Sequence, residues 1–500
     1  MENHATLAQI LPREITGMTR KLPFWLKLLY GSGDWGISSI GMMRSIFYAL
    51  YLTDVVGIEP RLASIGALVG IVWDAINDPL IGMISDRLKT RWGRRRPFLL
   101  WFAFPFGLSF VILWSAPNWE SQIALTFYVT LAFMLSDTLT TLVAMPYLSL
   151  TPELTRDYDE RTSLSSFRTV FQLLGAIAVV VAAPMIVDEV IRMGGTQQQG
   201  FMLAGAIFGL SGAIPLFFIG WFVREKFVPE QQEELPFRET LRVAWKNIPF
   251  RYAAGIYMFN WSAVDMIAII FPYFLLYWVS DGNLLAKVNV LGIDLALESA
   301  FFGIMMVVCI LFVPFWLWLA KTRNKREAYI LGMIFWVIVQ AMIFTIPQGN
   351  TNYLLFIGAL AGVGVSAAYI LPDSILPDVI EWDELRTRRR QEGIYYGIRT
   401  LIRKLTGALV IFITLQTLGW SGYQSPPDGA TQFTQPDSAL LAIRLMVSWL
   451  GAIVLAGTIA LAWSYPLSRE KYVRIQKLLK RRREEALAKK RSMIKRRTVE

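Results

Sequence analysis

Histidine and cysteine are almost absent from this sequence, and their scarcity excludes several kinds of site. The 500-residue chain has one histidine, His4, and one cysteine, Cys309, which lies inside an apolar run. A single cysteine cannot form an intrachain disulfide. Without histidine, the apolar segments offer no histidine proton relay, no His-ligated zinc and no Ser-His catalytic pair. A Gly-x-x-x-x-Gly-Lys-Ser/Thr nucleotide-binding motif is also missing, and we expect no enzyme activity.

Charged residues are scarce as well. They make up 17% of the chain against 54% hydrophobic residues, which leaves no room for a large aqueous domain. Apolar runs of about 20 residues are long enough to cross a lipid bilayer. We therefore predict an all-α membrane protein with twelve transmembrane helices, at residues 26–52, 62–85, 97–116, 122–149, 166–189, 200–223, 252–279, 297–320, 328–347, 353–377, 394–420 and 438–465.

The basic residues are distributed unevenly among the connections. Those after even-numbered spans carry basic clusters, whereas the others hold only Arg61, Arg192 and Lys287. By the positive-inside rule, both termini are cytoplasmic, most simply in the plasma (inner) membrane. The net charge of +11 is then explained by topology and does not indicate nucleic acid as a partner.

The longest polar connection divides the spans six and six. We predict a cytoplasmic tail at 1–23, an N-terminal half at 24–223, a central loop at 224–251, a C-terminal half at 252–465 and a basic tail at 466–500. Basic residues of that last tail would be attracted to anionic lipid headgroups. We expect a monomer whose partners are the bilayer and a small-molecule substrate.

Two aspartates lie in the middle of the second predicted span, in the segment from Trp73 to Pro79. Each would cost about 2.5–3.5 kcal/mol or more if it faced lipid. Asp74 and Asp78 are four residues apart and therefore share one face of a helix, with Asn77 beside them. Such a face requires a cation.

The same segment resembles the glycoside-pentoside-hexuronide:cation symporters, the branch of the major facilitator superfamily that includes the melibiose permeases. Tyr51 to Gly57, Arg91 to Phe98 and Asp378 to Glu384 carry the resemblance further along the chain. It implies the major facilitator fold, with two six-helix halves around a midplane site. It also implies secondary active symport by alternating access, driven by a cation gradient and without a cofactor.

The cation site implied by this resemblance consists of Asp74, Asn77, Asp78 and Thr141. All four offer oxygen atoms, which suits a hard cation such as Na⁺, with H⁺ and Li⁺ as alternatives. A bound cation would neutralise charge that is costly to carry through an occluded state.

The implied substrate site departs from the melibiose permeases. Arg168 and Lys404 match basic residues of the family site, but Ser38 and Ala144 replace its two aspartates, which argues against an α-galactoside. Asp34 lies one helical turn before Ser38 and offers a substitute acceptor for hydroxyl groups. We expect a sugar, a glycoside or a hexuronide as the substrate.

The alternative substrate is a lysophospholipid or another amphiphile, since Ile370 to Asp378 resembles helix 10 of lysolipid-transporting relatives. Two other charged residues have less definite roles. Arg44 is expected to pair with Asp34 or with a carboxylate of the second span. Asp265 is an isolated acid to which the resemblance gives no role.

A cytoplasmic gate is the last implied feature. The resemblance assigns charged residues near the loop between spans 2 and 3, and their partners, to a latch that holds the halves together in the outward-open state. The predicted members are Asp86, Arg87, Arg94, Arg161, Glu381 and Asp383.

Overall fold

The computed structural model describes residues 22–88, 90–155, 158–224, 242, 244–283, 285–290, 292–388, 392–427, 432–467 and 469–497. The tail at 1–21 and most of the central loop lie outside these residues. The side chains of Asp86 and Arg87 are also outside the description, although their backbone belongs to a helix.

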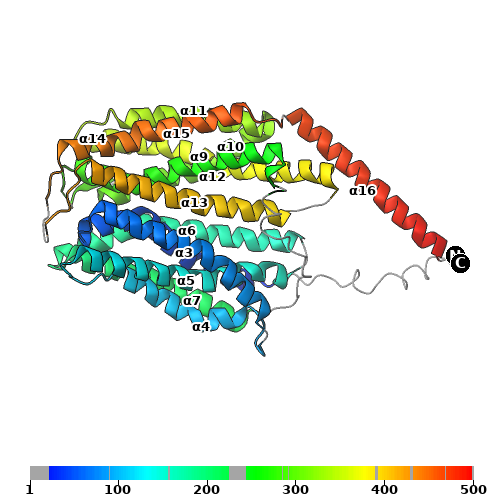
Figure 1. Ribbon diagram of the computed structural model, residues 1–500, viewed down its shortest axis with the longest axis horizontal. Coiled ribbons are helices and arrows are strands. Elements are labelled where there is room, and N and C mark those ends of the chain that lie inside the picture. The colour runs from blue at the N-terminus through cyan, green and yellow to red at the C-terminus, as the bar shows by residue number, and fades with distance from the viewer. Residues whose placement is uncertain are drawn as a thin grey trace.

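Six long helices form each half of the bundle (Figure 1). The N-terminal half contains α2 (Phe24–Leu50, continued by the π-helix η1, Tyr51–Val55), α3 (Pro60–Arg87), α4 (Arg96–Leu113), α5 (Gln122–Leu154), α6 (Tyr158–Arg192) and α7 (Gln197–Phe222). The C-terminal half contains α9 (Ile248–Tyr273, continued by η2, Phe274–Val279), α10 (Leu297–Thr322), α11 (Lys325–Ile343), α12 (Thr351–Thr387), α13 (Glu392–Trp420) and a last span of α14 (Asp437–Leu445), η3 (Met446–Leu450) and α15 (Gly451–Trp463).

The two halves lie side by side, with the C-terminal half above the N-terminal half in Figure 1. Three helix pairs join them: α2 with α9, α3 with α13, and α6 with α10. In the described residues, eleven helices are long and apolar enough to cross a membrane. The twelfth, α2, carries Lys27, Asp34 and Arg44 within its length. The all-α membrane fold expected from the sequence is confirmed.

Local sequence explains where several helices begin and how closely they pack. Thr196 and Gln199 form a capping box at the start of α7, in which each side chain accepts a hydrogen bond from the backbone of the other. Ser121 caps α5 in the simpler way. Where α2 crosses α7, a Cβ on Gly36 would lie 2.5 Å from Gly212 Cα, so this crossing requires glycine.

Two features differ from the expected spans. Helices α6 and α12 extend beyond the predicted ends at 166 and 377, because polar turns continue the apolar helices outside the bilayer length. The connection after η2 forms a β-hairpin of β1 (Lys287–Val290) and β2 (Ile293–Ala296), which pair antiparallel.

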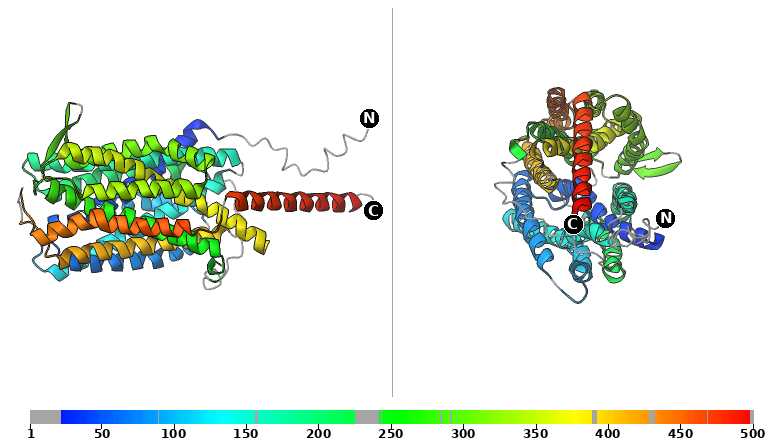
Figure 2. Two further views of the ribbon diagram at one scale, coloured as in Figure 1. Left: turned by 90° about the horizontal axis from the view of Figure 1, so that it is seen from above. Right: turned by 90° about the vertical axis from the view of Figure 1, so that its right-hand side faces the viewer.

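The basic tail is a long helix, α16 (Arg469–Arg497), that projects from one end of the bundle (Figures 1 and 2). We call this the terminal end, because α2 begins there and α15 finishes there. The opposite end, where η1 and η2 finish and the hairpin lies, is called the far end.

Candidate functional site

Lys404 of α13 lies between the two aspartates of α3. Its Nζ is 2.7 Å from Asp74 Oδ2 and also forms an ion pair with Asp78 Oδ2. Thr141 of α5 donates a hydrogen bond of 2.9 Å to the other oxygen of Asp78. Asn77 is buried, and its Nδ2 has no hydrogen-bond partner. The four predicted cation-site residues therefore share one region, to which the opposite half contributes a lysine.

The chemistry of this region suits a monovalent cation. The ammonium group of Lys404 is itself such a cation, and it is held by carboxylate oxygens of Asp74 and Asp78. Carboxylate, amide and hydroxyl oxygens are ligands for hard cations. In the described part of the chain, no three histidine, cysteine or acidic side chains gather as a metal centre. The sequence assigned Lys404 to the substrate site, and that role remains a prediction.

A third carboxylate lies beside this region, and the sequence reasoning missed it. Asp137 of α5 is 4% exposed and forms an ion pair of 3.3 Å with Arg44. Its other oxygen, Oδ2, is buried without a hydrogen-bond partner. The prediction that Arg44 pairs with Asp34 or with α3 was wrong. An acid inside an apolar span, one helical turn before Thr141, was the available signal.

A second cluster joins three helices of the N-terminal half. Arg168 Nε of α6 is 2.5 Å from Asp34 Oδ2 of α2. Tyr147 of α5 donates a hydrogen bond of 2.9 Å to the same oxygen, and the guanidinium of Arg168 lies 5.3 Å from the centre of its ring. Asp34 and Arg168, both predicted to bind the substrate, form an ion pair with each other, and their roles as substrate ligands remain predictions.

The other two predicted substrate residues offer little polar contact. Ser38 donates a hydrogen bond of 2.7 Å to the carbonyl oxygen of Gln172 in α6. Ala144 has no polar side-chain atom. Their roles as substrate ligands remain predictions.

The C-terminal half contains a balanced ion pair. Arg403 of α13 donates two hydrogen bonds, of 2.5 and 2.7 Å, to the two oxygens of Asp265 in α9. Its guanidinium lies 4.3 Å from the ring centre of Trp261. Trp261 in turn packs edge-on against Tyr369 at 5.1 Å. Asp265 therefore has a partner, which the sequence could not identify.

This ion pair borders a largely apolar cavity between α2 and the C-terminal half. The cavity has about 710 Å³ of open space, including its mouth. Its walls come from α2, α9, α10, α11, α12 and α13, and they include Ile46, Phe271, Phe301, Met305, Trp336 and Val365. Arg403, Asp265, Ser45, Gln340 and the hydroxyl of Tyr369 are its polar groups.

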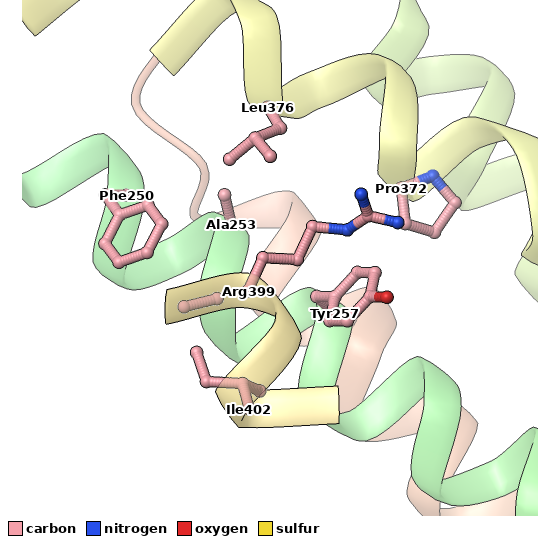
Figure 3. A pocket seen from close by; sticks show the side chains of 8 residues that line it. Phe250, Ala253, Tyr257, Pro372, Leu376, Arg399 and Ile402 are labelled. Atoms are coloured by element: carbon pink, nitrogen blue, oxygen red, sulfur yellow. The ribbon is translucent and has the colours of Figure 1, made fainter. Parts of the chain in front are cut away.

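A smaller pocket of about 300 Å³ lies nearer the terminal end of α9, between α9, α12 and α13 (Figure 3). Arg399 extends between Tyr257 and Pro372 in this view, and its guanidinium lies 4.9 Å from the centre of the Tyr257 ring. Arg399 also forms an ion pair of 2.7 Å with Asp373. The pocket is small, and the positive charge of Arg399 is already paired with Asp373.

The predicted gate residues lie at the terminal end. Arg94 is 2.7 Å from Glu153, and Arg161 donates a hydrogen bond to the carbonyl oxygen of Thr155. Asp383 forms an ion pair of 3.5 Å with Arg386. One oxygen of Glu381 is buried without a partner. Between described residues, the ion pairs at this end all join helices of the same half.

The far end is different, because hydrogen bonds there cross between the halves. Asp54 of η1 accepts hydrogen bonds from the hydroxyl groups of Tyr277 and Tyr423, both in the C-terminal half. Thr53 bonds Tyr273 at 2.9 Å. Nearby, Gln416 of α13 donates to Ser64 of α3, also at 2.9 Å. Five residues of this network are called the far-end junction: Thr53, Asp54, Tyr273, Tyr277 and Tyr423.

Comparison with known proteins agrees with this architecture. Residues 29–469 match the family model described as MFS/sugar transport protein, and the chain belongs to that family. An uncharacterized symporter of Synechocystis sp. is 32% identical over 93% of this chain and 98% of its own length. The mouse sodium-dependent lysophosphatidylcholine symporter 1 is 26% identical (92% and 89%), and the isoprimeverose transporter of Lactiplantibacillus pentosus 24% (90% and 90%).

Solved structures show the same fold at low sequence identity. The nucleoside transporter NupG has a TM-score of 0.58 at 11% identity, covering 87% of this chain and 98% of its own. A bacterial homolog of the lysosomal transporter Spinster has a TM-score of 0.60, also at 11% identity, with coverages of 90% and 96%. The protein is a multi-pass membrane transporter of the major facilitator type, a symporter and not an enzyme.

Proposed function

We propose that this protein couples the movement of its substrate to Na⁺, and that Asp74, Asn77, Asp78 and Thr141 bind the ion. The observation that carries the proposal is the position of Lys404, whose ammonium group is held by both aspartates of α3. A site that binds one monovalent cation through carboxylate oxygens can exchange it for another. Li⁺ or H⁺ would serve in the same place if Na⁺ does not.

Coupling follows from where Lys404 comes from. It belongs to the C-terminal half, whereas both aspartates belong to the N-terminal half, so these ion pairs hold α13 against α3. An added cation competes with Lys404 for the carboxylates and changes the strength of this attachment. The affinity for the cation then differs between the conformations of the bundle. Binding of the cation therefore shifts the populations of these conformations, and with them the affinity for substrate.

The far-end junction supports an alternating-access cycle. The halves are joined there by buried hydrogen bonds, while the described ion pairs at the terminal end stay within each half. We place the termini in the cytoplasm, so that this conformation faces inward. The gate at Asp86, Arg87, Arg94, Arg161, Glu381 and Asp383 would then join the halves in the opposite conformation.

A sugar, glycoside or hexuronide is the first candidate substrate. Asp34, Arg168 and Tyr147 offer a carboxylate, a guanidinium and a phenol at one place on the inner face of the N-terminal half. These groups can hydrogen-bond sugar hydroxyls. The isoprimeverose transporter among the relatives supports this candidate. A sugar would have to replace hydrogen bonds that Asp34, Arg168 and Ser38 already make.

An amphiphile such as a lysophospholipid is the second candidate, and the apolar cavity favours it. The cavity walls are aromatic and aliphatic, so an acyl chain would gain burial there, whereas sugar hydroxyls would lose their partners. Arg403 and Asp265 stand at its edge and could meet a zwitterionic headgroup. The lysophosphatidylcholine symporter among the relatives supports this candidate.

Ligand-dependent thermal stability of the protein in lipid nanodiscs tests the proposal. Sugars, glycosides, hexuronides and lysolipids are each added with Na⁺, Li⁺ or K⁺, and a ligand that binds the folded protein raises its melting temperature. A sugar whose effect grows with Na⁺ supports the first candidate, and a lysolipid that behaves so supports the second. A melting temperature that does not change with any of these cations would refute the proposed cation site.

A further inference from the structure

We propose that the guanidinium group of Arg444 binds the phosphate group of a phospholipid from the bilayer leaflet at the far end. Arg444 is the last residue but one of α14, just before the π-helix η3 of the last span. It is not among the residues that line the apolar cavity, and the proposed cation coupling does not involve it. The inference therefore goes beyond both the coupling ion and the transported substrate.

Two aromatic rings and one carbonyl group hold this guanidinium in place. Its Cζ lies 3.8 Å from the ring centre of Trp278 in η2 and 4.3 Å from that of Phe344, which follows α11. Its Nη2 donates a hydrogen bond of 2.9 Å to the carbonyl oxygen of Phe344. Trp278 is itself fixed, because its Nε1 donates to the carbonyl oxygen of Ile346 at 2.8 Å. These contacts orient the cation before a ligand arrives, which lowers the entropy lost on binding.

The positive charge of Arg444 is not balanced by the part of the chain that the structure describes. Arg444 forms no ion pair with a described residue, and its Nε is buried without a hydrogen-bond partner. The carbonyl oxygen at the end of α11 carries only part of a negative charge. Because a charged group at membrane depth is costly unless it is paired, an anion from outside the chain would stabilise this site.

Other arginines at the far end differ in this respect. Arg192 of α6 pairs with Glu189 at 2.5 Å, and Arg61 of α3 lies 3.7 Å from Glu59. Each of them has an acid within three residues along the chain. Local pairing therefore accounts for Arg61 and Arg192 but not for Arg444.

Arg444 lies at the depth where lipid phosphates are found. The last span, Asp437–Trp463, has 27 residues and is therefore about 40 Å long, whereas the hydrocarbon core is roughly 30 Å thick. Arg444 comes seven residues after Asp437, about 10 Å from the far end of this span. Helical side chains tilt toward the N-terminus of their helix, which here is the far end, so the guanidinium reaches toward the headgroups.

A lipid can approach this group from the side of the bundle. Arg444 and the two rings beside it are each partly exposed. Leu441, Leu445 and Trp449 form an exposed apolar stripe at helical spacing next to Arg444, and acyl chains would pack on it. Between described residues, Nη1 makes no hydrogen bond, so its donors remain for phosphate oxygens, which the fork of a guanidinium matches in geometry.

The experiment measures lipid binding by the rise in melting temperature of the protein purified in a nonionic detergent. Dioleoylphosphatidylglycerol is titrated into the wild type, Arg444→Gln and the control Arg192→Gln. The lipid concentration at half-maximal stabilisation should rise about tenfold in Arg444→Gln, because a charge-assisted contact is lost. It should not change in Arg192→Gln, since Arg192 already has an acid. Equal concentrations in Arg444→Gln and the wild type would overturn the proposal.

Two other probes identify the part of the lipid that is recognised. Dioleoylglycerol has the same acyl chains without the phosphate, and inorganic phosphate has no acyl chains. Each should stabilise the wild type far less than the phospholipid does. If dioleoylglycerol acted equally well, the contact would be purely apolar, and if inorganic phosphate did, the site would take a free anion. Either result would refute the proposed lipid.

A last comparison separates lipid binding from a purely structural role. If Arg444 only closes the end of α11, Arg444→Gln lowers the melting temperature by the same amount with and without the phospholipid, and the proposal is wrong. If Arg444→Gln does not fold, Arg444→Lys takes its place. Lysine keeps the charge without the fork, so the half-maximal lipid concentration should rise about threefold. An unchanged concentration in Arg444→Lys would then count against the proposal.

Discussion

Arg403 and Lys404 are neighbours on α13, yet they make opposite kinds of contact. Arg403 binds both oxygens of one aspartate in its own half, a balanced pair of one cation and one anion. Lys404 is shared between two aspartates of the other half and leaves negative charge in excess around it. On α13, Arg403 therefore forms an ion pair within the C-terminal half, whereas the adjacent Lys404 forms ion pairs with the N-terminal half.

The difference separates a pair with matched charges from a pair that, in our proposal, can be exchanged. The Arg403–Asp265 pair has matched charges and two hydrogen bonds, so breaking it leaves one charge without its partner. A cation shared among several carboxylates can be exchanged for another cation at lower cost, since the carboxylates keep a partner. Lys404 has the geometry of the exchangeable kind.

The largest effect is expected at Asp78, which both Lys404 and Thr141 contact. Asp78→Asn removes the charge that holds either cation, so Na⁺-driven uptake into proteoliposomes should fall by about 100-fold or more. Asp188→Asn is the matched control for losing a buried acid. Uptake that still follows the Na⁺ gradient in Asp78→Asn would contradict the site.

Lys404→Gln should separate binding from transport. Removing the competing ammonium group leaves Asp74 and Asp78 free for Na⁺, so the Na⁺ concentration at half-maximal thermal stabilisation should fall by about tenfold. Uptake should be lost nevertheless, because α13 no longer responds to the ion. Weaker Na⁺ binding in this variant would show that Lys404 helps to form the site and does not compete for it.

Asp265→Asn tests the balanced pair. It leaves Arg403 partly unpaired beside Trp261 and changes the edge of the cavity, so the substrate concentration at half-maximal uptake should rise by about tenfold. Na⁺-dependent stabilisation without substrate should be unchanged, since this pair does not contact the α3 aspartates. If Asp265→Asn weakened substrate uptake and Na⁺-dependent stabilisation equally, the Arg403–Asp265 pair and the ion pairs of Lys404 would act as one unit.

The sequence predicted the helical bundle, and it indicated the acids inside the spans more fully than the groups that pair with them. Hydrophobic runs report which segments cross a membrane, and an acid inside one reports that something must neutralise it. They do not report which helix supplies the neutralising group, because that depends on packing between segments far apart in the chain. The pairs Arg44 with Asp137 and Arg403 with Asp265 became visible only in three dimensions.

The π-helices and the far-end junction show the same limit. Tyr277 lies in η2 and Tyr423 follows α13, and neither stands out in sequence among 18 tyrosines. Their shared contact with Asp54 arises because the two halves meet at that end. Asp54 lies in the segment from Tyr51 to Gly57 that carries the family resemblance, but the sequence gives it no role in joining the halves.

The smallest effect is expected at this junction. Tyr423→Phe removes one hydroxyl from Asp54 and leaves that of Tyr277, so the conformation closed at the far end should lose about 1 kcal/mol, a fivefold shift in population. Thiol labelling of Ser64→Cys in a Cys309→Ala background reports this opening, since Ser64 is fully buried between the halves. The labelling rate from the far side should rise about fivefold in Tyr423→Phe. It should not rise in the control Tyr353→Phe, because the Tyr353 hydroxyl bonds Thr345 within the C-terminal half. An unchanged labelling rate would mean that the far-end junction does not stabilise the conformation closed at the far end. The ion pairs between Lys404 and α3 alone would then decide which end is closed.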